Sequence, residues 1–454
     1  MASNKDTIIA PATAVADAGI AVVRISGDRS LSFLQTYFKS HKKDCDFDSH
    51  HLYLGRIFDT EGNVIDEVMA VYMAPPRTYT CEPVVEIQCH GSRQVVTRIL
   101  DLAHNHHIRL AQPGEFTYRA YLNGRLDLVQ AEAVSRLIQS TTDLSRRSAL
   151  QQLDGFLSRQ LHYFSTSIKQ ILVHIEAWID FPEETLPEEN INHFSDTITY
   201  ICQQMSDLTN TYHAGQFVHN GATVAFAGLP NAGKSSLMNA LLQQERSIVS
   251  HVPGTTRDTI EQSFQLDGIQ IRLIDTAGLR DSNDFVEQEG VRRAKTALSR
   301  ADLVLLVLDG TVPPYDDFRD LVASFSDVAS FLVVNKTDIM AEHPDLHFYG
   351  GPVVFVSAKH GSGLSELKKQ ITDFLLRDYL PSSEPAYLTE QRHYEALSAA
   401  AAYLNRFLVN LGTVELDLLS IDLRDCLHAL ASITGEVSSE AVLDEIFSTF
   451  CIGK

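Results

Sequence analysis

The segment that indicates chemistry most directly is GLPNAGKS at residues 228–235, which matches the phosphate-binding pattern GxxxxGK[ST]. It lies directly after an apolar run that predicts a strand and directly before residues 237–242, which predict a helix. Its glycines let backbone amides close around phosphate oxygens, while Lys234 reaches the β- and γ-phosphates and the Ser235 hydroxyl binds Mg²⁺. This segment predicts a nucleoside triphosphate site.

Three further motifs follow in the order expected of a GTPase. DTAG ends a predicted strand, where Asp275 can approach Mg²⁺ and the Gly278 amide can meet the γ-phosphate. NKTD lies at 335–338, where the Asp338 carboxylate accepts from both N1–H and the exocyclic amine of guanine, a pattern that adenine does not offer. SAK at 357–359 offers a backbone amide to guanine O6. An ordinary capped turn explains any one motif, but four in this order indicate a GTPase.

The loop GTTRD at residues 254–258 resembles the first switch of GTPases, with Thr256 completing the Mg²⁺ shell. Arg257 is either an arginine finger or a surface arginine. Leu279 stands where Ras-type proteins carry a water-orienting Gln, and because an apolar side chain does not position water, another group must do so. The nearby acidic candidates are Asp281, Asp284, Glu287 and Glu289.

These motifs define an expected nucleotide site with Mg²⁺ bound by Ser235 and Thr256. The residues expected to contact GTP are Asn231, Ala232, Gly233, Lys234, Ser235, Ser236, Ser250, Thr255, Thr256, Asp275, Thr276, Ala277, Gly278, Asn335, Lys336, Asp338, Ser357, Ala358 and Lys359.

Three kinds of element must position these residues. The first 120 residues contain β-rich runs at 20–25, 67–73 and 84–89, separated by turn signals, which favours an α+β domain. Apolar residues at helical spacing predict one long helix over 150–178, a second over 194–213, and further helices over 397–411 and 416–430. Between these helical blocks, strands alternate with helices, which is typical of a parallel sheet covered on both faces. Its expected strands are 223–227, 269–274, 301–308, 330–334 and 353–356.

The composition favours a cytoplasmic protein of several domains. The chain has 454 residues, above the size at which one core usually divides. Its 37 Lys and Arg against 58 Asp and Glu give a net charge of −21, which excludes a general nucleic-acid binder, so RNA contact requires a local basic surface or a partner protein. The six Cys form no CxxC pair, which favours reduced thiols. No apolar run is long enough to span a membrane, and no signal peptide begins the chain.

Taken in order, GLPNAGKS, GTTRD, DTAGLR, NKTD and SAK, with the terminal FCIGK, closely resemble the tRNA-modification GTPase family MnmE, also called TrmE. In the N-terminal half the resemblance rests on PGEFT at 113–117 and RAYLNGRLDL at 119–128, so that it covers the whole chain. Two positions depart from the family pattern. Arg125 stands where Lys is frequent, which keeps the charge, and Ser92 stands where a second Gly usually follows Gly91.

The resemblance implies a multidomain α/β and α architecture. An α+β N-terminal tetrahydrofolate-binding and dimerisation domain spans 1–120, and a Ras-like P-loop G domain spans 218–379. The G domain is inserted into a helical bundle made of two segments, 121–217 and 380–454. The helical periodicity agrees with this division, because neither helical block is complete alone.

The resemblance also implies a function. The family is a homodimer that acts with the flavoprotein MnmG (GidA), as a heterotetramer, on tRNA. It installs a carboxymethylaminomethyl-type group at C5 of the wobble uridine, with 5-formyl- or methylene-tetrahydrofolate as one-carbon donor. GTP hydrolysis accompanies dimerisation of the G domains, and K⁺ serves where other GTPases use an arginine finger.

Carried onto this chain, the family's site residues fall into two groups. In the G domain, Asn231 would bind K⁺ through its side chain, main-chain groups of Ser250, Val252 and Thr255 would complete that site, and Glu287 would orient the attacking water. The folate positions are Arg24, Glu86, Arg125 and Lys454, since a pterin edge suits a carboxylate and a glutamate tail suits cations.

Other interpretations remain open at this point. Without the resemblance, a structural ion pair is the first interpretation of Arg24 and Glu86, and Cys451 is explained equally well by an inert thiol and by a catalytic one. The terminal CIGK superficially fits a prenylation box, although Lys is not a usual last residue there. The histidines at 104, 106 and 107 favour a solvated turn over a metal site. The rival functions are a ribosome-assembly GTPase and a folate-dependent methyltransferase with a regulatory G domain.

Overall fold

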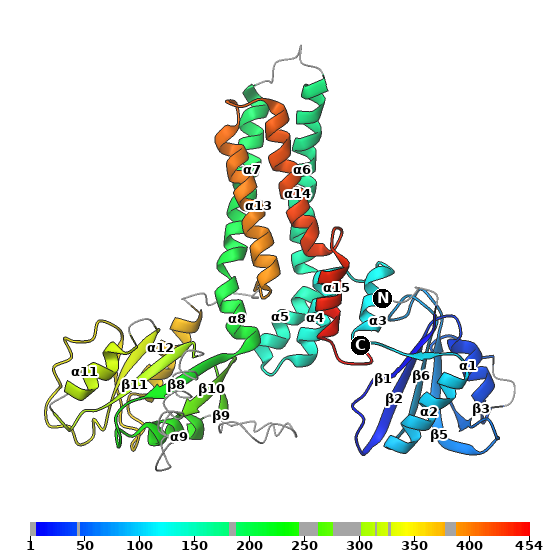
Figure 1. The fold of residues 1–454 in the computed structure, drawn as a ribbon, viewed down its shortest axis with the longest axis horizontal. Coiled ribbons are helices and arrows are strands. Elements are labelled where there is room, and N and C mark those ends of the chain that lie inside the picture. Colours follow the sequence, from blue (N-terminus) through cyan, green and yellow to red (C-terminus); the bar gives the residue numbers. More distant parts are fainter. Residues whose placement is uncertain are drawn as a thin grey trace, which may run out of the picture. The chain divides into compact units, whose positions relative to one another are not determined.

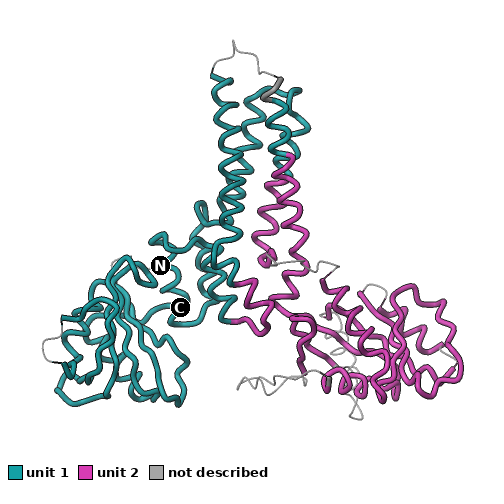
Figure 2. The backbone as a smooth tube through the Cα atoms, turned by 180° about the vertical axis from the view of Figure 1, so that it is seen from behind, with its two compact units in different colours: residues 1–138, 150–198, 402–454 teal, residues 139–149, 199–401 magenta. Residues whose placement is uncertain are grey.

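The computed structural model of the protein describes residues 6–42, 46–180, 188–244, 262–275, 301–313, 316–325, 328–376 and 387–454. The chain forms two compact units (Figure 2). The first comprises Met1–Ile138, Leu150–Ile198 and Ala402–Lys454, and the second comprises Gln139–Ala149 and Thr199–Ala401. Each unit therefore joins segments that are distant in the sequence. Within the described ranges, no helix is both long and apolar enough to cross a bilayer.

The first unit contains a seven-stranded sheet in the order β3-β4-β5-β6-β2-β1-β7 (Figure 1). Its strands are β1 (Ile8–Pro11), β2 (Ala18–Ser26), β3 (Phe38–Ser40), β4 (His51–Phe58), β5 (Val64–Met73), β6 (Val84–Gly91) and β7 (Arg109–Leu110). The pairs are antiparallel except for β1 with β7. Alternate residues such as Val23 and Ile87 join a core shared with helices α1 (Ser30–Tyr37) and α2 (Arg93–Asn105). Arg24 and Glu86 therefore point to the opposite face of the sheet.

Helices make up the rest of this unit. They are α3 (Glu115–Leu122), α4 (Leu128–Gln139), α6 (Phe156–Asp180), α14 (Leu416–Thr434) and α15 (Glu440–Ser448), with parts of α5 (Asp143–Leu153), α7 (Glu188–Asn210) and α13 (Gln391–Asn410). Helix α6 packs along α14, and Arg424 of α14 donates to Glu176 of α6 at 2.8 Å. The two segments of the helical region, far apart in sequence, thus form one bundle.

The second unit is built on a six-stranded sheet in the order β13-β12-β11-β8-β10-β9. Its strands are β8 (Ala222–Ala227), β9 (Gln262–Leu266), β10 (Ile269–Asp275), β11 (Leu303–Asp309), β12 (Ser330–Asn335) and β13 (Val353–Phe355). Its own described helices are α8 (Tyr212–Asn220), α9 (Lys234–Gln244), α11 (Asp316–Ala323) and α12 (Leu364–Leu376). Cores lie on both faces of the sheet, as the continuous apolar strands require.

Three details differ from the sequence-based expectations. The long helix expected over 150–178 is two helices, because Gly155 adopts φ +79° and separates α5 from α6. The helix expected over 194–213 ends at Asn210, and a new helix, α8, starts at Tyr212. The α/β sheet is not wholly parallel, since β9 pairs antiparallel with β10.

Candidate functional site

The phosphate-binding loop lies between β8 and the N-terminus of α9, as the motif predicts. Gly228 and Gly233 adopt φ +159° and +91°, and a Cβ on either would collide, with the Val307 carbonyl and the Asn335 side chain respectively. Lys234 Nζ donates to the carbonyls of Gly228 and Leu229, both at 2.9 Å. The loop therefore closes on its own lysine at a helix N-terminus, which is a geometry suited to phosphate oxygens.

Asn335 ties three motifs together behind this loop. Its Nδ2 donates to the Ala232 carbonyl at 3.0 Å, and its Oδ1 accepts from the Ala358 amide at 3.1 Å. The side chain is 2% exposed, so these bonds replace those that water would make. The NKTD segment, the SAK segment and the phosphate loop consequently meet at the carboxyl edge of the sheet.

Asp338 is held beside Ser357 at the same edge. The Ser357 hydroxyl donates to Asp338 Oδ1 at 2.7 Å, and this bond holds the pKa of the Asp338 carboxyl below its usual value. The carboxylate is thus charged and oriented at neutral pH. Such a group accepts from two parallel donors, which is what a guanine edge presents.

Several expected nucleotide residues lie outside the described residues: Ser250, Val252, Thr255, Thr256, Arg257, Thr276, Ala277, Gly278 and Glu287. The structure gives the backbone of Asp275, the last residue of β10. Asp275 pairs with Phe226 of β8, and β8 ends one residue later, at Ala227, where the phosphate loop follows. Asn231 lies in this loop, exposed and with φ +61°. Ser235 and Ser236 lie in the first turn of α9, after Lys234, and are exposed, and Lys359 follows the Ser357–Ala358 pair.

A second group of the expected residues comes together in the first unit. Arg24 and Glu86 are opposite each other on β2 and β6, and Arg24 Nε donates to Glu86 Oε1 at 2.7 Å. Lys454 lies near both: burial lowers the pKa of its amine, Arg24 lowers this pKa further, and Glu86 opposes the shift. The tail before Lys454 packs on β1, because a Cβ on Gly453 would collide with the Pro11 carbonyl. The two ends of the chain therefore meet at this site.

Arg125, the fourth expected folate residue, lies beside Tyr79, which also contacts Arg24. Its Nη1 donates to the Tyr79 carbonyl at 2.8 Å, and its guanidinium lies 4.8 Å from the centroid of the Tyr79 ring. The Arg24 guanidinium lies 5.3 Å from the same centroid. Arg24 Nη1 is buried and donates no hydrogen bond within the described part of the chain. Three cations and one carboxylate thus lie near one another, beside a buried Arg24 Nη1 that has no acceptor among the described residues.

Cys451 is exposed, while its carbonyl accepts from the Gly114 and Lys454 amides at 3.5 and 3.3 Å. The backbone bonds fix the tail that carries Lys454. Among the described residues, no cluster of three metal-ligating side chains is present, and the histidine run at 104–107 ends α2.

Sequence reasoning missed two residues at these sites. Asp309 ends β11 and accepts from Lys336 Nζ at 2.5 Å, which ties the Lys336 side chain of the NKTD turn to the end of this strand. An Asp at the end of an apolar run was the available signal. Tyr79 lies in the loop between β5 and β6, and its neighbours become visible only in three dimensions.

Comparisons with known proteins agree over the whole chain. Residues 7–125 match the model described as the GTP-binding protein TrmE N-terminus, and residues 128–451 match the MnmE helical domain. The chain is 43% identical to the tRNA modification GTPase MnmE of Syntrophotalea carbinolica, over 99% of this chain and 100% of the relative. It is 41% identical to the MnmE of Geobacter sulfurreducens, over 99% of both chains. Among solved structures, it is similar to the G domain of the T. maritima FeoB iron transporter, with 32% identity, a TM-score of 0.27, and coverage of 34% of this chain and 98% of that one.

Proposed function

Because the chain belongs to the MnmE family of tRNA modification GTPases, we propose that its GTP hydrolysis serves the modification of C5 of the wobble uridine in tRNA. The group installed is of the carboxymethylaminomethyl type. The observation that carries this proposal is similarity along the full chain to relatives of that name, 38–43% identical. The proposed division is an N-terminal domain at 1–120, a helical domain at 121–217 and 380–454, and a G domain at 218–379.

In the G domain, the phosphates of GTP bind the loop amides and Lys234, and the guanine base binds Asp338. The support is the set of hydrogen bonds at the carboxyl edge of the sheet. Asn335 is bonded to the phosphate loop and to the SAK segment, and Ser357 of the SAK segment is bonded to Asp338. The proposed Mg²⁺ ligands are Ser235 and Thr256, with Asp275 nearby. When bound, Mg²⁺ neutralises charge on the phosphates.

For the N-terminal domain we propose a tetrahydrofolate carrying a one-carbon unit, 5-formyl- or methylene-tetrahydrofolate. The fit rests on the chemistry of the residues present. Glu86 accepts a hydrogen bond, Arg24 has a buried Nη1 with no acceptor among the residues that the structure describes, and Arg125 and Lys454 add positive charge. A folate offers both a donor edge on its pterin ring and a carboxylate tail, so one ligand matches every group.

The proposed partners are a second copy of the chain, the flavoprotein MnmG in a heterotetramer, and tRNA, all in the cytoplasm. A homodimer is supported by the sheet face that carries Arg24, where Leu52 and Leu54 are 46% and 51% exposed and lie opposite Val71 and Met69. Contact with tRNA through the flavoprotein is supported by the net charge of −21.

The test is mass spectrometry of tRNA nucleosides from cells that lack this protein and from cells that carry Arg24→Ala or Asp338→Asn in its place. We expect the C5-modified wobble uridine to disappear in all three. Unchanged nucleosides in the deletion strain, together with a ribosome-assembly defect, would favour the rival GTPase function.

A further inference from the structure

We propose that Tyr79 is a positioning residue of the N-terminal site, and that its ring holds the guanidinium groups of Arg24 and Arg125 where an anionic ligand meets them. This inference rests on the folate site proposed above. It adds to that site a residue which touches both arginines.

The contacts of the Tyr79 ring are the first support. The guanidinium carbons lie 5.3 Å (Arg24) and 4.8 Å (Arg125) from its centroid, within the range of cation–π attraction. Arg125 is also hydrogen-bonded to the Tyr79 carbonyl. One residue therefore fixes Arg125 through its backbone and both guanidinium groups through its ring.

The charge balance explains why an aromatic residue suits this position. Arg24 has Glu86 as its counterion, but in the part of the chain that the structure describes Arg125 forms no ion pair. Lys454 brings a third positive charge, and Arg24 lowers the pKa of this amine after burial has done so. Gathered cations repel one another. A carboxylate at position 79 would neutralise these cations. An aromatic ring attracts them without neutralising their charge, so an anionic ligand still meets a positive site.

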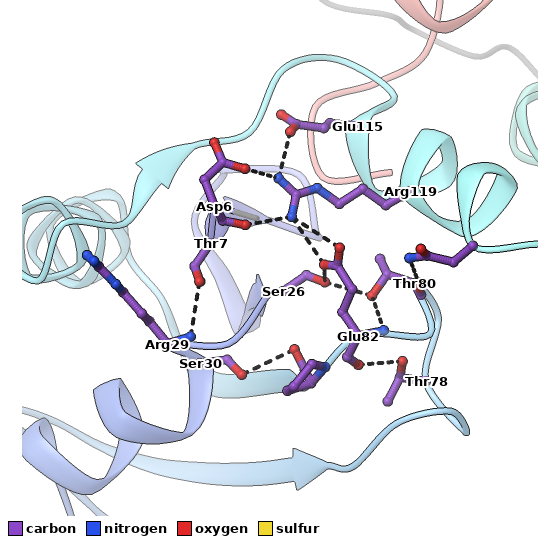
Figure 3. Close-up of polar contacts among 12 residues, drawn as sticks. Asp6, Thr7, Ser26, Arg29, Ser30, Thr78, Thr80, Glu82, Glu115 and Arg119 are labelled. Atoms are coloured by element: carbon purple, nitrogen blue, oxygen red, sulfur yellow. Dashed lines mark hydrogen bonds and ion pairs between the residues drawn. The ribbon is translucent and has the colours of Figure 1, made fainter. Parts of the chain in front are cut away.

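Hydrogen bonds hold the loop that carries Tyr79, and Figure 3 shows those of its neighbours Thr78 and Thr80. The Tyr79 hydroxyl is 2.8 Å from Thr117 Oγ1, and the fully buried Thr80 hydroxyl is 2.6 Å from Ser26 Oγ. Asn123 Nδ2 donates to the Thr80 carbonyl at 2.6 Å. The bonds made by Tyr79 and by Thr80 thus order the loop that carries the ring, which reduces the ordering that ligand binding requires.

The experiment compares Tyr79→Leu with Tyr79→Phe, measuring the Kd of 5-formyltetrahydrofolate by calorimetry on the full chain. We expect Tyr79→Phe to stay within about threefold of the natural protein, because the ring remains, and Tyr79→Leu to bind about tenfold more weakly. Thr117→Val is the matched control: it removes the partner of the hydroxyl and keeps the ring, so we expect it to resemble Tyr79→Phe. The GTP hydrolysis rate should be unchanged in all three.

A double-mutant cycle with Arg125→Ala separates positioning from general folding, since the loss caused by Tyr79→Leu should shrink to about threefold or less when Arg125 is absent. An additive loss in that background, or equal losses in Tyr79→Leu and Tyr79→Phe, overturns the inference.

Arg24→Ala distinguishes failure of the folate proposal from failure of the Tyr79 proposal. If Arg24→Ala binds normally, the folate function is wrong; if it loses binding while Tyr79→Leu does not, only the role of Tyr79 is wrong.

Discussion

At the scale of single residues, Asp338 is the side chain that we propose selects the base. Its carboxylate is oriented by the Ser357 hydroxyl at 2.7 Å, and this bond lowers its pKa. We predict that Asp338→Asn weakens GTP binding by about 100-fold, because an amide presents a donor to the guanine amine and leaves polar groups unpaired. Xanthosine triphosphate should then bind the variant better than GTP, since its O2 accepts from the new amide.

Calorimetry with GTP, ATP and xanthosine triphosphate measures this change. Asp345→Asn is the control, because Asp345 is exposed in the loop after NKTD and should leave all three affinities unchanged. Equal affinity of the natural protein for ATP and GTP would contradict the role given to Asp338.

At the scale of elements, one buried arginine joins α3 to the sheet of the first unit. Arg119 is 3% exposed, and its Nη2 donates to Asp6 at 2.6 Å and to Glu115 at 3.0 Å, while Nη1 lies 3.2 Å from Glu82 (Figure 3). We predict that Arg119→Leu lowers the free energy of unfolding by about 3 kcal/mol, because it leaves Glu82 without its cationic partner and leaves Asp6 and Glu115 with Arg109 alone. Thermal unfolding measures it. Arg98→Met, which removes an exposed ion pair with Asp59, is the control and should leave the midpoint unchanged.

The same network gives the first unit a dependence on pH. Burial raises the pKa values of Asp6 and Glu115, but hydrogen bonds from Arg109 and Arg119 outweigh burial, so both pKa values are lowered. The stability that these carboxylates contribute is therefore present above their usual pKa values of about 4 and is lost as the pH falls through the folded values. We predict that unfolding midpoints fall with acid below about pH 4, and less so in Arg119→Leu. Parallel acid curves for the two proteins would contradict this assignment.

The elements also show what the sequence could and could not predict. Strands β8, β11 and β12 were predicted because continuous apolar runs between turn residues have one interpretation in an α/β fold. The break at Gly155 was missed because the apolar spacing continues across it, although an isolated Gly was a signal. Strand β9 reads QSFQL, too polar to stand out, and becomes a strand by pairing with β10. The family resemblance predicted Arg24 and Lys454 together, but the role of Tyr79 depends on a contact between its loop and Arg24 of β2, which no local pattern records.

At the scale of the whole molecule, the proposed homodimer requires a self-complementary surface. Leu54 of β4 is 51% exposed on the sheet face that carries Arg24. We predict that Leu54→Glu shifts the protein from dimer to monomer, because a charge in an apolar interface is desolvated without a partner. Light scattering across a concentration series measures the mass. Val173→Glu, at a 63% exposed position on α6, is the control and should remain a dimer. A dimer of unchanged stability in Leu54→Glu would exclude this face.

Hydrolysis also needs positive charge near the oxygen that bridges the β- and γ-phosphates, where negative charge develops as that bond breaks. Leu279 is apolar and does not orient water, and the sequence offers Arg257 as its one ambiguous arginine finger.

Asn231, exposed in the phosphate loop with φ +61°, is the proposed side-chain ligand of a monovalent cation. Since charge does not distinguish K⁺ from Na⁺, selectivity must come from size: the smaller ion would draw its ligands inward and misplace Thr256. We predict that K⁺ accelerates GTP hydrolysis about tenfold or more over Na⁺, and that Asn231→Ala abolishes the difference while GTP still binds. Initial rates in KCl and NaCl at matched ionic strength measure this. Equal rates in the natural protein would exclude the cation site. Arg257→Ala would then be the variant to test, because hydrolysis would depend on that guanidinium.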